Sequence, residues 1–143
     1  MARSIVVGTD GSEPADEAVR QATDMASREG ARLHLVTAYL DPQFVRVRMP
    51  SGAHTETVDL REVAESLLRR AAHDALSKGV EVETHVREGH PAEVIIDVAN
   101  QERADLIVLG SRGLTGIKRY LLGSVSSEVS HHARCSVMIV RTT

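Results

Sequence analysis

LIVLGSRGLTGIKRYLLGS, residues 106–124, joins an apolar run to a glycine-rich connection, and its context decides the fold. The pattern predicts a buried strand over residues 106–109 and a helix over residues 125–132, directly after the stretch. Its glycines are Gly110, Gly113, Gly116 and Gly123. Glycine allows positive φ and lets another group come close to the main chain. Between a strand and a helix, such a connection commonly aims N–H groups at an anion, so the stretch predicts a phosphate-binding loop. The alternative is that the glycines only shape turns.

Strand and helix patterns alternate over the rest of the chain. Strands are predicted at residues 4–9, 32–39, 80–87, 106–109 and 136–140. Helices are predicted between Ser12 and Gly30, and at residues 58–77, 92–101 and 125–132. This order predicts an α/β fold, a doubly wound, Rossmann-like, five-stranded parallel sheet with helices on both faces. Residues 1–143 are expected to form one domain.

Apolar content predicts where some strands lie in the sheet. Residues 106–109 are the most apolar, which predicts the central strand, whereas residues 80–87 alternate and predict a sheet edge. His34 is interpreted as a paired or edge-facing strand residue rather than a ligand. Residues 40–55 lack periodicity and contain two prolines and a glycine, so they are predicted to form a long loop, with a lid over the site as one hypothesis.

Composition limits the classes of function. A net charge of −3, with only 2% aromatic residues, argues against a nucleic-acid partner, which needs a basic face or stacking platforms. No stretch reaches 18 apolar residues, and the N-terminus lacks a signal-peptide pattern, so neither a membrane span nor secretion is expected. Cys135 is the only cysteine, which excludes an intrachain disulfide and predicts a cytoplasmic protein.

The glycine stretch matches neither of the common phosphate-binding motifs. A Walker loop needs Lys followed by Ser or Thr after its last glycine, and the dinucleotide fingerprint needs G-x-G-x-x-G. The spacing here is Gly110-x2-Gly113-x9-Gly123-Ser124, after the fourth strand of a domain whose first strand ends in Asp10. In this combination the whole chain resembles the universal stress protein family.

The resemblance implies a fold similar to that of the adenine nucleotide alpha hydrolases, a homodimer and, because the motif is intact, the ATP-binding branch of the family. ATP, with ADP or AMP as alternatives, and Mg²⁺ are the implied ligands. The implied nucleotide-binding residues are Thr9, Asp10, Ala38, Gly110, Ser111, Arg112, Gly113, Gly123, Ser124 and Val125. Asp10 would also lie near a phosphate-bound Mg²⁺, and the main chain of Ala38 would bind adenine.

Two of these residues have simpler interpretations from the sequence alone. Ser124 can be a plain helix cap, although a cap on its own requires no upstream glycines. Asp10 can form an Asx turn before Ser12. His90, His131 and His132 form no recognisable metal-ligand set.

Three functions are compatible with these patterns. The first is a nucleotide-dependent regulatory or stress-response protein with an unknown protein partner. The second is an enzyme, a slow ATPase or a nucleotide-transferring protein, although no Walker lysine is present. The third is a dimer without nucleotide, against which the intact glycines count. The apolar last strand, Ser136 to Val140, would leave an unpaired edge if it were outermost, so the homodimer is predicted to form through it.

Overall fold

The computed structural model of the chain describes residues 3–50, 52, 54–111 and 124–141. Its main sheet contains five parallel strands in the order β5-β2-β1-β6-β7. These strands are β1 (Ser4–Gly8), β2 (Arg32–Tyr39), β5 (Val82–Glu88), β6 (Leu106–Gly110) and β7 (Ser136–Val140). The helices are α1 (Glu13–Glu29), α2 (Leu60–Ser77), α3 (Pro91–Gln101) and α4 (Ser124–His132). The doubly wound α/β prediction is confirmed.

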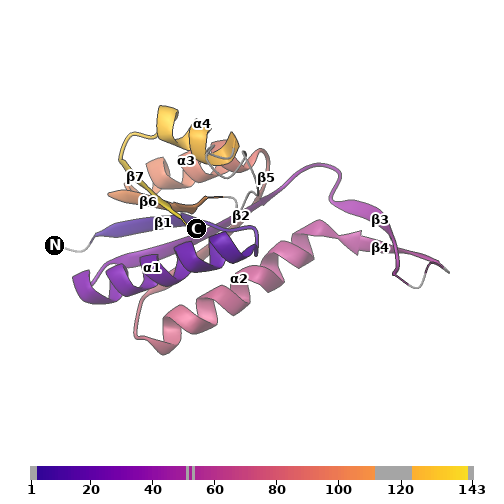
Figure 1. Cartoon of the computed structure of the whole chain (residues 1–143), viewed down its shortest axis with the longest axis horizontal. Coiled ribbons are helices and arrows are strands. Elements are labelled where there is room, and N and C mark those ends of the chain that lie inside the picture. Colours follow the sequence, from indigo (N-terminus) through magenta and orange to yellow (C-terminus); the bar gives the residue numbers. More distant parts are fainter. Residues whose placement is uncertain (1–2, 51, 53, 112–123, 142–143) are drawn as a thin grey trace.

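The helices cover both faces of the sheet. Figure 1 shows α1 and α2 on one face and α3 and α4 on the other. Successive strand residues point to opposite faces, so Ile5 and Val7 join the core under α1 and α2, while Val6 joins the core under α3 and α4. Burial on both faces explains why these strands are continuous apolar runs.

Local capping sets the helix ends. Ser12 Oγ accepts a hydrogen bond from the Ala15 N–H at 3.4 Å, and Gly30 ends α1 at φ 66°, both as predicted. The second helix begins at Leu60 rather than at residue 58. The Asp59 carboxylate caps it by accepting from the N–H groups of Arg61 and Glu62.

The prediction that residues 106–109 form the central strand is wrong. The central strand is β1, and β6 lies between β1 and β7. Apolar content reports that a strand is covered on both faces, and it does not distinguish the middle of a sheet from the adjacent position. The alternating strand β5 does lie at one edge, and β7 lies at the other.

Residues 40–55 do not form the predicted unstructured loop. They contain β3 (Phe44–Arg48), which pairs antiparallel with β4 (Thr55–Asp59) and forms a separate two-stranded sheet. Figure 1 shows this hairpin extending away from the main sheet. Phe44 is 58% exposed, so the ladder of hydrogen bonds, rather than burial in a core, holds the two strands together.

Among the helices, over the residues that the structure describes, none is both long enough and apolar enough to cross a bilayer.

Candidate functional site

The order of the strands reverses direction at β1. From β1 the chain builds β2 on one side, and it later returns to place β6 on the other side. Gly8 pairs with Val36 of β2, and Val7 pairs with Val108 of β6, so the carboxyl ends of three neighbouring strands lie together. In open α/β sheets this reversal is where ligands bind.

A pocket occupies this position. It is formed by the ends of the strands and the first turns of the helices that follow them. Its lining consists of Gly8, Thr9, Asp10, Ser12, Pro14, Ala15, Val36, Ala38, Pro91, Ile95, Leu109, Gly110, Val125 and Ser126. Of the described lining residues, Asp10 alone carries a charged side chain. The described wall is therefore mainly apolar side chains and main chain.

Three helices begin at this pocket. The first turns of α1, α3 and α4 contribute Pro14, Pro91 and Val125 to its wall. The first N–H groups of a helix have no partner within the helix, and the helix dipole adds partial positive charge there. A pocket flanked by three such ends therefore suits a ligand with an anionic group.

Five of the residues predicted from the sequence line this pocket. They are Thr9, Asp10, Ala38, Gly110 and Val125. Asp10 Oδ1 accepts a hydrogen bond from the Ser12 N–H at 3.0 Å, which is the Asx turn considered as the alternative. The turn fixes the position of the carboxylate at the wall of the pocket, so the two interpretations of Asp10 are compatible.

The other predicted residues lie elsewhere or outside the described residues. The Ser111 N–H donates to the Val140 carbonyl at 2.8 Å. Ser124 is exposed and is the first residue of α4, so its N–H has no acceptor within the helix. Neither serine belongs to the described lining. The predictions for Arg112, Gly113 and Gly123 concern residues outside the described ranges.

Gly110 has a packing role that the sequence does not reveal. A Cβ added at this position would overlap the Pro14 carbonyl group and lie 2.9 Å from the Ala15 nitrogen. These contacts are with the backbone of the first turn of α1, which cannot rotate aside as a side chain can. Gly110 therefore lets β6 approach α1 closely, whatever its contribution to a ligand.

Sequence reasoning missed the contribution of α3. Pro91 and Ile95 lie on successive turns of that helix and both line the pocket. The signal that could have identified them is Gly89-His90-Pro91 at the end of β5, because a proline at the start of a helix marks the turn at the carboxyl edge of the sheet.

The chain has clear relatives. The profile of the universal stress protein family matches residues 1–141. A universal stress protein of Mycobacterium tuberculosis is 38% identical over 147 residues, covering 99% of this chain and 97% of the relative. One of Methanocaldococcus jannaschii is 34% identical over 141 residues, covering 97% of this chain and 82% of the relative.

Solved structures share the fold. A universal stress protein crystallised in complex with cAMP is 31% identical and superposes with a TM-score of 0.76, covering 99% of this chain and 98% of its own. A universal stress protein from Archaeoglobus fulgidus is 25% identical and has a TM-score of 0.72, with coverages of 97% and 93%.

Proposed function

The chain belongs to the universal stress protein family, and on that premise we propose that it binds an adenine nucleotide, ATP first among them, in the pocket at the carboxyl ends of β1, β2 and β6. The observation that carries the proposal is the convergence of three strand ends and three helix N-termini on that pocket. The cAMP complex of a relative that is 31% identical supports an adenine nucleotide as the class of ligand.

Each part of the nucleotide has a counterpart in the wall. The apolar side chains of Val36, Ile95 and Leu109 offer contact area to the base and ribose, and the main chain of Ala38 offers hydrogen bonds to adenine. The phosphates would lie toward the helix N-termini. The residues proposed to lie along the ribose and the phosphates are Gly110, Arg112, Gly113, Gly123, Ser124 and Val125, with Ser111 beside them.

Asp10 is the proposed ligand of a magnesium ion that accompanies ATP. Mg²⁺ is usually held by one or two carboxylates together with phosphate oxygens and water, and Asp10 supplies a carboxylate at the pocket wall. The chemistry that Mg²⁺ would supply there is neutralisation of phosphate charge. Thr9 holds the turn behind Asp10, because its Oγ1 accepts from the Gly11 N–H at 3.2 Å.

We propose a regulatory role for the bound nucleotide, with a cytoplasmic location, rather than efficient catalysis. Rapid phosphoryl transfer requires a positioned nucleophile or water and cations around the γ-phosphate. Among the described residues lining the pocket, Asp10 is the one carboxylate, and the glycine stretch carries no Walker lysine. ATP hydrolysis, the alternative function, should therefore be slow.

The proposed homodimer forms through β7. The other edge strand, β5, carries Glu83, Arg87 and Glu88, and charged residues protect an edge from pairing. Strand β7 instead carries apolar Val137 and Ile139. Sedimentation at micromolar concentration should show a species of about twice the 15.5 kDa chain mass. A single 15.5 kDa species would contradict the dimer.

Calorimetric titration of the purified full chain with ATP, AMP and cAMP, each with and without Mg²⁺, tests the nucleotide proposal. Thermal unfolding provides a second measurement, because ligand at 100 times its Kd adds about 2.7 kcal/mol to the free energy of unfolding. Phosphate release in the same samples separates binding from hydrolysis. If none of the three nucleotides binds, the proposal is wrong.

The Asp10→Asn variant tests the role assigned to magnesium. Asparagine can still accept from the Ser12 N–H, so the turn survives, but the negative charge is lost. ATP affinity in Mg²⁺ should fall about tenfold, or about 1.4 kcal/mol, while cAMP affinity holds. Asp97→Asn, at an exposed position on α3, removes the same charge away from the pocket and should change neither.

A further inference from the structure

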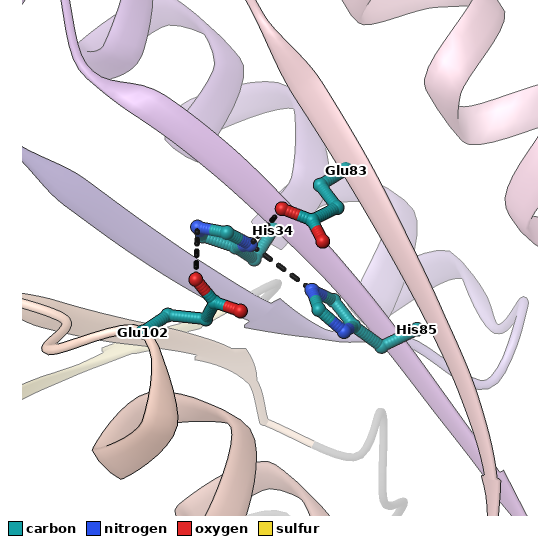
Figure 2. A group of neighbouring side chains, drawn as sticks. All are labelled: His34, Glu83, His85 and Glu102. Atoms are coloured by element: carbon teal, nitrogen blue, oxygen red, sulfur yellow. Dashed lines mark hydrogen bonds and ion pairs between the residues drawn. The ribbon is translucent and has the colours of Figure 1, made fainter.

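A second cluster of ligand-type side chains lies away from the pocket. This His34 cluster consists of His34 on β2, Glu83 and His85 on β5, and Glu102, which caps the C-terminus of α3. Figure 2 shows the four side chains pointing toward one another. One ligand atom from each lies within 4.8 Å of those of the others.

Strand register brings these residues together. His34 is the pairing partner of Glu83, and the next residue on the same face of β5 is His85, which pairs with Val36. Helix α3 runs back over this face and delivers Glu102 at its end. His34 is 1% exposed, so the sequence interpretation of an edge-facing residue is wrong, while that of a paired residue is correct.

The distances suit a metal ion on one nitrogen of His34. Its Nδ1 lies 3.0 Å from His85 Nε2 and 3.7 Å from Glu83 Oε2. Ligand atoms at 2.0–2.1 Å from a tetrahedral zinc ion are about 3.3 Å apart, so the observed separations lie on either side of that value. Small side-chain movements would therefore complete a site with two imidazoles and one carboxylate.

The other nitrogen of His34 faces a carboxylate, which lies just beyond hydrogen-bond distance. His34 Nε2 lies 3.9 Å from Glu102 Oε2, on the side away from Glu83 and His85. A carboxylate beside one ring nitrogen favours the proton there and leaves the lone pair of the other nitrogen for a metal. Glu102 is thus placed to set the tautomer of His34.

The cluster contains more hydrogen-bond acceptors than donors. With its proton on Nε2, neutral His34 presents a lone pair at Nδ1, and the Glu83 carboxylate can only accept. His85 Nε2 can supply one proton to this group of acceptors. Burial lowers the pKa of both histidines.

We propose that His34, His85 and Glu83 bind a divalent transition-metal ion, with Zn²⁺ the best match to two imidazoles and a carboxylate, and that Glu102 orients His34. The fourth position is left to water. The half-exposed Glu83 carboxylate gives the ion access from solvent, whereas a groove at the amino ends of the strands, lined by His34 and Glu102, lies on the Nε2 side of the His34 ring. This site is separate from the proposed nucleotide pocket and stands independently of it.

The test is titration of chelator-treated, tag-free full chain with Zn²⁺ by calorimetry and with Co²⁺ by visible absorption. One equivalent of each metal should bind, Co²⁺ should give the intense visible bands of a low-coordinate site, and Zn²⁺ should raise the unfolding temperature. His85→Gln and Glu83→Gln should each weaken Zn²⁺ binding by at least about tenfold, and Glu102→Gln by about tenfold to a hundredfold.

His54→Gln is the matched control. His54 also lies beside a carboxylate, 3.4 Å from Glu56 Oε1, but it is exposed on the β3–β4 hairpin. Zn²⁺ affinity should be unchanged in this variant. Circular dichroism checks that each variant is folded. If His85→Gln does not fold, Glu83→Gln still tests the proposal, because the Glu83 side chain is half-exposed and its substitution should not prevent folding. Absent Zn²⁺ binding, or binding that survives both His85→Gln and Glu83→Gln, would overturn the proposal.

Discussion

The two ends of α3 serve different kinds of site. At its N-terminus, Pro91 lines a pocket built mainly from main chain and apolar side chains. Beyond its last residue, about 16 Å away along the axis, Glu102 belongs to a cluster built from titratable side chains. The helix dipole matches this division, because its positive end faces the pocket proposed for an anion and its negative end faces the cluster proposed for a cation.

The difference predicts opposite sensitivities. A pocket defined by close backbone approach should be damaged by added atoms, because there is no room for them. A cluster defined by side-chain donors should be damaged by removed atoms, because its contacts depend on them. Substitutions at each end of α3 can therefore show whether the two sites differ in this way.

The largest effect is expected from Gly110→Ala. The added Cβ overlaps the backbone of α1 at Pro14, so the variant should lose about 3 kcal/mol of unfolding free energy in urea denaturation. Gly8→Ala is the matched control, since its Cβ meets the terminal Cδ1 of Ile95 at 2.5 Å and that side chain can rotate. Its cost should be about 1 kcal/mol. Equal costs would contradict the backbone argument.

A smaller loss is expected from His34→Ala, measured in chelator by the same method. Deleting a fully buried imidazole leaves a cavity and removes the partner of His85, which should cost about 2 kcal/mol. Nucleotide affinity should be unchanged, because His34 lies outside the pocket lining. A comparable loss of nucleotide binding would show that the two ends of α3 are not independent.

The smallest effect is expected from coupling between the two ligands. Sites this far apart without shared partners usually act additively to within about 0.5 kcal/mol. Thermal unfolding with ATP alone, with Zn²⁺ alone and with both measures the coupling, with free metal buffered so that ATP does not remove it. A clearly larger coupling would mean that α3 transmits binding from one end to the other.

The sequence predicted the elements that pack on the core, because burial of one face imposes a period on the residues. The helices from Glu13 and Leu60 carry such a period, and the strands that are covered on both faces are marked instead by continuous apolar runs. The sequence could not predict the β3–β4 hairpin, because most of its residues are exposed and no core imposes a pattern on them. Nor could it predict where α2 begins, since the pairing of Val58 and Asp59 with β3 delays the helix.

The pocket was more predictable than the His34 cluster for a similar reason. Glycine spacing within one connection, together with Asp10 at the end of the first strand, is a local pattern that indicates the carboxyl edge of the sheet. The cluster draws His34, Glu83 and Glu102 from distant parts of the chain, and they are joined by strand register and by the packing of α3 on the sheet. The single local signal was the alternate spacing of Glu83 and His85, which many exposed strands share.

The pairing of β1 with β6 has a consequence for synthesis of the chain. The Ser4 N–H donates to the Asp105 carboxylate, 101 positions later, and Ile5 pairs with Leu106. At about 5–20 residues per second, a ribosome needs several seconds to supply the second partner of the first strand. Through that interval β1 has a neighbour on one side only, so the nascent chain exposes an apolar strand edge that chaperones can bind.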